Sequence, residues 1–283
     1  MNNRLNTAWV HSRLKEAGSW SKHALGQNFL IDESVLDAVV AAANLAPGET
    51  VIEIGPGLGV LTERLLEKGV TVICFEFDTT MIRVIHQDFT KEIIAGTLRL
   101  VEGDAIHTLP TVLATIPGEY KVVANIPYQI TTPLINVLLE KGPRPTLLSL
   151  LMQKEVGERL AAGPGMSERS FLSVLTQYFS DVQVVRTVPP EAFYPAPSVN
   201  SAVVRIAVRK NRLLPDEQEQ HFLRFVRMGF QQRRKQLKNV LAGVRGLSPA
   251  AMQDVLVKQG FKPNIRAQEL SLEEWVKLFV MKI

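Results

Sequence analysis

The chain has 283 residues, of which 46% are hydrophobic and 21% charged, which suits a globular protein with one large domain or a large and a small one. The single cysteine, Cys74, excludes an internal disulfide framework and is expected in the core, and the five histidines show no metal-ligand spacing, so no metal is expected. No apolar run reaches the about 18 residues of a membrane span, and residues 1–18 lack the apolar core of a secretion signal, so we expect a cytoplasmic protein.

The first two thirds of the chain alternate between apolar runs and helical patterns. Runs rich in Val, Ile and Leu predict strands buried on both faces of a parallel sheet, over residues 51–55, 71–75, 98–101, 121–124 and 146–152. Apolar residues at helical spacing predict helices over residues 32–45, 58–68, 79–94 and 133–140. Asp32 and Asp78 are expected to cap two of these helices. This alternation predicts a doubly wound, Rossmann-like α/β domain.

The pattern changes toward the C-terminus. Residues 181–188 and 199–208 alternate as strands do, with a Pro-rich segment and no helix between them, so we expect an antiparallel pair at the sheet edge. After Lys210 the strand pattern ends. Helices are predicted over residues 217–241, 249–259 and 272–282, the last beginning at Ser271. The sequence therefore predicts a large domain over residues 1–209 and a small all-helical domain over residues 210–283.

Positive charge is concentrated in one stretch of the chain. Residues 205–245 hold 11 Lys and Arg against 3 Asp and Glu, which gives +8, so the rest of the chain carries 4 − 8 = −4. A basic stretch on a mildly acidic protein indicates a polyanionic partner, although a solvated helix face would look similar.

A glycine loop follows the first predicted strand. Gly55-Pro56-Gly57-Leu58-Gly59 opens a helix, and glycines there let the backbone approach a ligand closely. The dinucleotide fingerprint needs a glycine at position 60, where Val60 stands. The tighter G-x-G-x-G spacing is typical of S-adenosylmethionine sites, which have no pyrophosphate to bind. A tight strand-to-helix turn is the alternative interpretation.

Acidic residues follow the next two predicted strands. Glu76 stands at the position where a carboxylate binds ribose hydroxyls, whereas Asp78 suits the cap of the following helix. Asp104 could accept a hydrogen bond from an adenine amino group, and helix capping is again the alternative. The carboxyl ends of parallel strands meet at one edge, so these acids and the glycine loop predict a single S-adenosylmethionine site.

The fourth predicted strand runs into Asn125-Ile126-Pro127-Tyr128. The amino nitrogen at adenine N6 is a poor nucleophile because its lone pair is delocalised into the ring. An enzyme that methylates it needs two hydrogen-bond acceptors that hold the amine and draw it toward tetrahedral geometry. Asn125 supplies a side-chain carbonyl, and the backbone carbonyl of Ile126 or Pro127 can supply the other. Pro127 fixes the backbone, and Tyr128 can stack on an extruded base.

These motifs resemble the ribosomal RNA adenine N6,N6-dimethyltransferases, the KsgA/RsmA or dimethyladenosine transferase family, over nearly the whole chain from about Lys22. The matching segments are 27–30 (Gln-Asn-Phe-Leu), 53–57 (Glu-Ile-Gly-Pro-Gly), 125–128, 152–156, 188–190, 193–199, 231–238 and 266–270. The resemblance implies that segment 27–30 covers the methionine part of the cofactor. Its implied cofactor contacts are Gln27, Asn28, Leu30, Gly55, Gly57, Glu76, Asp104 and Asn125.

The resemblance also implies the substrate. The family dimethylates two adjacent adenosines in a hairpin near the 3′ end of small-subunit ribosomal RNA, with a role in subunit biogenesis. Phe193 is implied on the other face of the target base from Tyr128. We expect a monomer that contacts RNA phosphates in its basic stretch through Arg233, Arg234, Lys235 and Lys238.

Two alternatives to this function stay open. Ile126 stands where small-subunit enzymes more often have Leu, and Ile is common in the related large-subunit methylases of antibiotic resistance. A large-subunit adenine methylase is therefore the first alternative, although the C-terminal segment argues against it. The second is a non-catalytic RNA-binding or assembly factor, against which Asn125, Tyr128 and the complete cofactor set argue.

Overall fold

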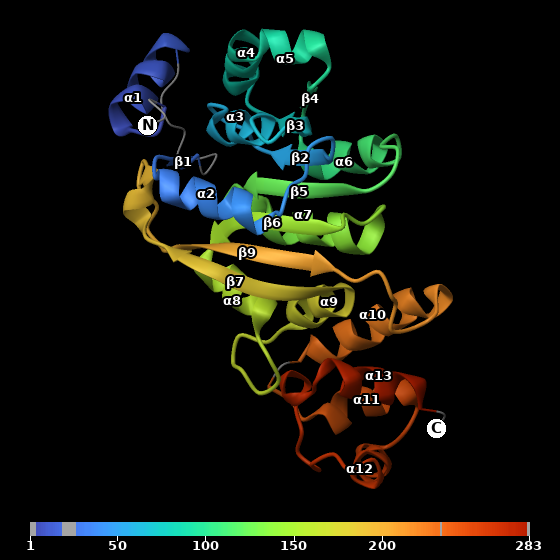
Figure 1. Ribbon diagram of the computed structural model, residues 1–283. Helices are drawn as coiled ribbons and strands as arrows, with labels where there is room; N and C mark the ends of the chain where they lie inside the picture. Colours follow the sequence, from blue (N-terminus) through green and yellow to red (C-terminus); the bar gives the residue numbers. More distant parts are fainter. Residues whose placement is uncertain (1–3, 19–26, 233, 282–283) are drawn as a thin grey trace. The chain divides into compact units, whose positions relative to one another are not determined.

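The computed structural model describes residues 4–18, 27–232 and 234–281 (Figure 1). Among them, seven strands form one sheet in the order β4-β3-β2-β5-β6-β9-β7. Neighbouring strands from β4 to β6 are parallel, and β9 is antiparallel to β6. The strands are β2 (Thr50–Ile54), β3 (Thr71–Glu76), β4 (Leu98–Glu102), β5 (Tyr120–Asn125), β6 (Leu147–Gln153), β7 (Ser180–Val188) and β9 (Ser201–Val208). The predicted α/β fold and the position of the last two strands at the sheet edge are confirmed.

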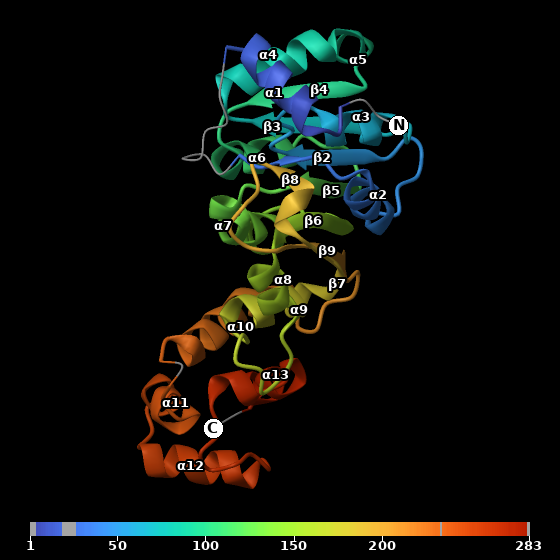
Figure 2. The same cartoon turned by 90° about the vertical axis from the view of Figure 1, so that its left-hand side faces the viewer.

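Helices cover both faces of this sheet. Figure 2 shows α2 (Glu33–Ala42) and α3 (Val60–Leu66) on one face and α6 (Ala105–Leu113) and α7 (Thr131–Asn136) on the other. Near β3 and β4 lie α4 (Thr79–Asp88) and α5 (Thr90–Ala95). Asp32 and Asp78 cap α2 and α4 through bonds from Val35 N and Thr80 N, as predicted.

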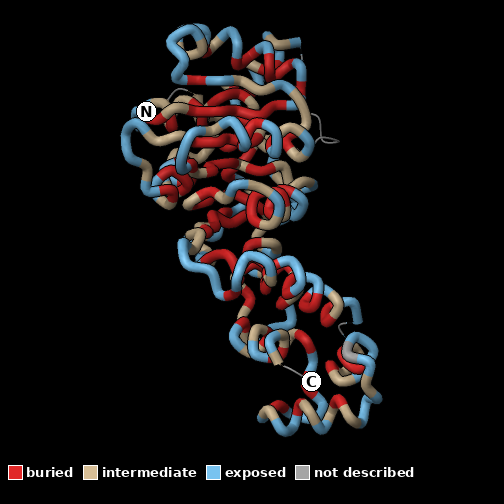
Figure 3. Tube along the Cα trace, turned by 90° about the vertical axis from the view of Figure 1, so that its right-hand side faces the viewer, coloured by how far each residue is buried: buried red, intermediate tan, exposed pale blue. Residues whose placement is uncertain are grey.

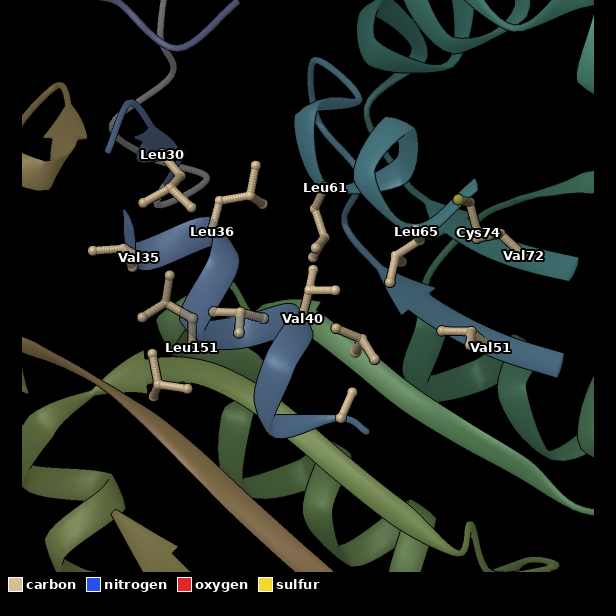
Figure 4. Close-up of a cluster of buried hydrophobic side chains, with 14 of the residues drawn as sticks. Leu30, Val35, Leu36, Val40, Val51, Leu61, Leu65, Val72, Cys74 and Leu151 are labelled. Carbon is tan, nitrogen blue, oxygen red and sulfur yellow. The ribbon is translucent and has the colours of Figure 1, made fainter. Parts of the chain in front are cut away.

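The core under α2 and α3 explains why these segments fold as they do. Buried apolar side chains of both helices pack on strand residues such as Val51, Val72 and Cys74 (Figure 4). Cys74 is fully buried, as predicted. Buried positions recur at helical spacing in α2 and continuously in the strands. One face of the helix and both faces of the strands are therefore buried, as the sequence patterns predict.

Two very short strands were not predicted. Phe29 and Leu30 form β1 (Phe29–Leu30), which pairs antiparallel with β8 (Phe193–Tyr194), so that Leu30 lies opposite Phe193. Ile31 N also donates to Ala192 O at 2.8 Å. These bonds hold the 27–30 segment against a part of the chain more than a hundred residues away in sequence.

One helix predicted in the first two thirds is interrupted, and others were missed. The predicted helix over residues 79–94 is two helices, because Phe89 leaves helical geometry (φ −120°, ψ 28°) and buries its ring. The predicted helix over residues 133–140 begins earlier, at Thr131, and ends in a π-helical turn, Val137–Lys141. Helices α1 (Thr7–Glu16), α6, α8 (Lys154–Ala161) and α9 (Phe171–Phe179) were not predicted.

The chain forms two compact units. The first contains residues 1–157 and 181–208, and the second contains residues 158–180 and 209–283. The last part of the second unit begins at residue 209, one residue before the predicted boundary at 210. The predicted small domain did not include residues 158–180. One contact that joins this segment to the C-terminal residues is made by Arg169, which is fully buried and donates to Leu270 O at 3.1 Å.

The second unit is helical and has an aromatic core. Its C-terminal helices are α10 (Asp216–Phe230), α11 (Leu237–Arg245), α12 (Pro249–Lys258) and α13 (Leu272–Val280). Ser271 begins α13 with a capping box, as predicted. Trp275 is fully buried beside Phe225 and Phe230, and a Cβ at Gly229 would lie 2.3 Å from its ring. Figure 3 shows buried residues recurring along these helices between exposed ones.

The predicted helix over residues 217–241 is also two helices. It breaks between α10 and α11 because Leu237 is buried and its backbone N donates to Ile265 O at 2.8 Å. We call residues 231–232 and 234–236 the basic turn. None of the described helices has both the length and the apolar character that a membrane span requires.

Candidate functional site

A cavity of about 330 Å³ lies at the carboxyl ends of the central strands of the first unit. From β2 the chain proceeds to β3 and β4 on one side of the sheet and later to β5 and β6 on the other. The strand order therefore reverses at β2, where doubly wound folds bind ligands. We call this space the carboxyl-end cavity. It is lined by all eight residues predicted to bind a cofactor, Gln27, Asn28, Leu30, Gly55, Gly57, Glu76, Asp104 and Asn125.

The glycine loop forms one wall of the cavity. Gly55, Gly57 and Gly59 all have positive φ (67°, 56° and 78°), which favours glycine. A Cβ at Gly59 would also lie 2.4 Å from the buried Phe89 ring. The loop therefore needs glycine for its backbone geometry and for close packing, and it brings α3 to the cavity with no side chain at these three positions.

Glu76 is held rigidly at the end of β3. Its Oε1 accepts from the backbone N of Phe77 and of Asp78, both at 2.8 Å, and its Oε2 accepts from Gly57 N at 3.3 Å. Burial raises the pKa of Glu76, and these backbone bonds oppose that rise. A carboxylate has about four acceptor sites, so Glu76 can still accept from a ligand.

Two aspartates near this wall also have structural roles. Asp78 caps α4 and accepts from Gln27 Nε2 at 3.0 Å, which ties the 27–30 segment to the end of β3. Asp104 caps α6 through Ile106 N (2.9 Å), and its other oxygen lies 2.9 Å from His107 Nδ1. Both interpretations of Asp104 are therefore compatible with the structure, because it lines the cavity and caps a helix.

The tetrapeptide begins at the last residue of β5. Asn125 Nδ2 donates to Asn28 O at 3.2 Å. A carbonyl oxygen only accepts hydrogen bonds, so the amide nitrogen must face Asn28, and Asn125 Oδ1 is left as the acceptor at the other end of the amide. Ile126 is buried, and its backbone N donates to Leu151 O at 3.0 Å. The neighbouring strand β6 therefore fixes where the tetrapeptide leaves the sheet.

The rest of the tetrapeptide turns along the cavity. Pro127 O accepts from Ile130 N at 3.1 Å, which engages one of its lone pairs and leaves the Ile126 carbonyl as the better second acceptor. The Tyr128 and Ser201 hydroxyls share a hydrogen bond of 2.7 Å. Burial raises the pKa of Tyr128, with the Ser201 bond opposing it. The ring is therefore fixed by a residue of β9.

Phe193 is not brought to this site. It is 3% exposed, belongs to the same core cluster as Leu30 and Val35, and does not line the carboxyl-end cavity. The pairing of β8 with β1 directs it into that core. The structure therefore buries Phe193 opposite the cavity residue Leu30, and its contact with a ligand base stays a prediction.

The predicted phosphate-binding residues lie in the second unit. Arg234 and Lys235 are exposed in the basic turn, and Lys238 on α11 donates to Gln253 Oε1. Arg233 lies outside the described residues. The structure thus places the two described cations of the turn in solvent, and it constrains Lys238 more than the sequence suggests.

Glu53 is a feature of the cavity that the sequence analysis treated only as part of a motif. It is 1% exposed, and its Oε2 accepts from Thr62 Oγ1 (2.7 Å) and Cys74 Sγ (3.2 Å). Burial raises the pKa of Glu53 to about 7 and raises that of the Cys74 thiol. A charged residue inside the apolar run 51–54 was the signal that could have identified it.

The cavity fits a cationic nucleoside ligand such as S-adenosylmethionine. Glu53 lines the cavity and its Oε1 is buried without a hydrogen-bond partner among the described residues, which suits a positively charged ligand. Glu76 offers acceptors for hydroxyls, and Phe77 is an exposed aromatic ring on the cavity wall. In the same described residues, no group of three or more His, Cys, Asp or Glu could hold a metal ion.

Comparisons with known proteins agree on one family. The family model described as ribosomal RNA adenine dimethylase matches residues 18–283. The small-subunit ribosomal RNA methyltransferase A of Syntrophotalea carbinolica is 40% identical, covering 91% of this chain and 95% of the relative. The protein of the same name from Moorella thermoacetica is 38% identical, covering 94% and 93%.

Solved structures show the same fold. A dimethyladenosine transferase from Plasmodium falciparum is 27% identical with a TM-score of 0.73, covering 88% of this chain and 95% of its own. The 23S rRNA methyltransferase ErmE is 24% identical with a TM-score of 0.72, covering 89% and 98%. Because these TM-scores are nearly equal, the fold alone does not distinguish a dimethyladenosine transferase from a 23S rRNA methyltransferase.

Proposed function

The chain belongs to the ribosomal RNA adenine dimethylase family, and on that premise we propose that it dimethylates N6 of two adjacent adenosines near the 3′ end of small-subunit ribosomal RNA. The observation that carries the proposal is the position of Asn125: its amide is fixed by Asn28 at the wall of a cavity that fits S-adenosylmethionine. The names of the small-subunit relatives support this RNA as substrate. Such a substrate also implies a role in subunit biogenesis and a cytoplasmic location.

The cofactor contacts divide by chemistry. When bound, S-adenosylmethionine supplies a methyl group on a sulfonium, which is already activated. We assign its ribose hydroxyls to Glu76, its adenine to Asp104, its methionine part to the 27–30 segment and Asn125, and close backbone approach to Gly55 and Gly57. The three backbone bonds to Glu76 support its role, because they fix the carboxylate orientation before a ligand binds.

The acceptor amine is held by Asn125 and the backbone that follows it. Asn125 Oδ1 and the Ile126 carbonyl accept from the two N–H bonds of adenine N6, so that the nitrogen lone pair is drawn out of conjugation. Pro127 fixes the direction of this backbone, and Tyr128 supports one face of the base. No proton donor to the leaving group is needed, because a neutral thioether leaves.

The small unit contributes affinity for RNA. Arg233, Arg234, Lys235 and Lys238 are proposed phosphate contacts, and the exposure of Arg234 and Lys235 supports this role. We propose that residues 1–157 with 181–208 form the catalytic domain of a monomer, and that the remaining residues form the RNA-binding domain.

A methyl-transfer experiment tests this function against its alternatives. Purified protein and labelled S-adenosylmethionine are incubated with small subunits and large subunits that lack adenine dimethylation, and the modified adenosines are mapped. We expect label at two adjacent adenosines of the small subunit. Label on the large subunit alone would support a resistance-type methylase instead, and RNA binding without label would support an assembly factor.

A further inference from the structure

A second cavity adjoins the first. It measures about 160 Å³ and is lined by Gln27, Asn28, Tyr128, Gln153, Pro197, Ser198 and Val199, all in the first unit. Gln27, Asn28 and Tyr128 line both cavities. Methyl transfer requires donor and acceptor to meet, so a space that shares a wall with the carboxyl-end cavity at Tyr128 is positioned for the acceptor.

Gln153 is a residue of this second cavity that no assigned role uses. It is the last residue of β6, it is half-buried, and it lies opposite Ser201 in the register of β6 with β9. Ser201 holds the Tyr128 hydroxyl, and Leu151 of the same strand accepts from Ile126 N. The strand that positions the tetrapeptide therefore also positions Gln153, and within the described residues its side-chain amide makes no hydrogen bond.

The chemistry of the bases makes a glutamine informative at this position. The amino group of adenine is flanked by two ring nitrogens, N1 and N7, which both accept hydrogen bonds. In guanine the corresponding exocyclic group is a carbonyl, and N1 carries a proton. A glutamine amide can donate to an adenine ring nitrogen while other acceptors hold the amine, and it reads an extruded base by its edge.

We propose that the second cavity receives the acceptor base and that Gln153 selects adenine by donating from Nε2 to a ring nitrogen beside the amino group. The inference rests on the proposed function and adds to it a residue that recognises the base. Gln153 thus forms the specificity contact, whereas Asn125 and the Ile126 carbonyl hold the reacting amine. Tyr128, fixed by Ser201, separates the two cavities and serves both.

Gln153→Ala and Gln153→Glu test this contact, with Gln183→Ala as a matched control on the exposed face of β7. Gln153→Glu keeps the side-chain size but loses the donor. We measure kcat/KM for methyl transfer to small subunits reconstituted with adenosine, 1-deazaadenosine or 7-deazaadenosine at the target positions. Both Gln153 variants should lose about tenfold on adenosine, as expected for one lost hydrogen bond that leaves an unpaired partner, and Gln183→Ala should lose nothing.

The deaza substrates separate recognition from a structural effect. The unaltered protein should lose about tenfold on one of the two analogues, and Gln153→Ala should lose nothing further on that analogue. Dissociation constants for S-adenosylmethionine should be unchanged in all variants. If the loss from Gln153→Ala multiplied with the loss from the analogue on both analogues, the inference about Gln153 would be wrong and the proposed function would stand. A Gln153→Ala variant as active as the unaltered protein would have the same meaning. No transfer by the unaltered protein to any adenosine would overturn the proposed function and this inference with it.

Discussion

The carboxyl-end cavity and the basic turn are both proposed to act on the same RNA, yet they are built differently. The cavity is lined by side chains whose orientation is fixed by bonds from other elements, as Asn125 is by Asn28 and Glu76 by three backbone N–H groups. Arg234 and Lys235 stand exposed on a turn between two helices. Chemistry needs geometry, whereas attraction of phosphates needs mainly charge, so substitutions in the two regions should have different kinds of effect.

Substitution of Asn125 should have the largest effect. Asn125→Ala removes the acceptor for the amine, and we expect methyl transfer to fall about 100-fold or more, as for loss of one preorganised polar group at a reacting centre. RNA affinity should be nearly unchanged, because the phosphate contacts lie in the other unit. Initial rates with labelled S-adenosylmethionine and a filter-binding assay measure the two quantities.

Asn239→Ala is the matched control for this experiment, because Asn239 is exposed on α11 in the other unit. It should retain the activity of the unaltered protein. If Asn125→Ala retained it as well, the catalytic assignment would be wrong. If Asn125→Ala lost RNA affinity as strongly as activity, the proposed division between a catalytic cavity and an RNA-binding turn would be wrong.

Much of the cavity could be predicted from the sequence because its parts follow strand ends. A parallel sheet brings all its carboxyl ends to one edge, so Gly55, Glu76 and Asn125 could be grouped without knowledge of their distances. Apolar runs also predicted the ends of the five parallel strands β2 to β6 to within one residue. Local pattern and tertiary structure agree wherever an element is buried along its whole length.

The remaining features depend on contacts distant in sequence. Strands β1 and β8 have two residues each, too few for a pattern, so the burial of Phe193 could not be predicted. The Asn125–Asn28 bond joins residues 97 positions apart. Residues 158–180 belong to the second unit, and one of the contacts that join them to it runs from the buried Arg169 to Leu270 O, which no spacing rule predicts.

Titration of Glu53 in the cavity should make the free energy of unfolding of the protein depend on pH. Its pKa is about 7 in the folded protein and near 4.5 when unfolded, so the folded state binds the proton more tightly. The stabilisation is complete below pH 4.5 and is lost as pH rises through about 7. This shift corresponds to a fall of about 3 kcal/mol in the free energy of unfolding. Glu53→Gln should remove that fall.

Urea unfolding at about pH 5 and about pH 8 measures this effect as the difference between the unaltered protein and the variant. Glu191→Gln is the matched control, because Glu191 is exposed and lies outside the core. It should leave the pH dependence unchanged. Parallel pH profiles of stability for the unaltered protein and Glu53→Gln would show that Glu53 is not the buried titrating group. The cavity would then differ from the exposed basic turn in geometry but not in a buried charge.

The basic turn should give the smallest effect and a different kind of effect. Arg234→Gln with Lys235→Gln removes two exposed cations, so the slope of log binding constant against log salt should become less steep by up to about 2. Affinity at low salt should weaken, whereas S-adenosylmethionine binding should stay unchanged, because the cofactor candidates lie in the first unit.

The matched control is Arg83→Gln with Lys91→Gln, two exposed cations of α4 and α5. An unchanged slope in the Arg234 and Lys235 variant, or an equal change of slope in the control, would show that RNA does not bind the basic turn in preference to other positively charged surface. In that case the affinity for RNA would have to come from other cations of the protein, and the proposed difference in role between the cavity and the basic turn would not hold.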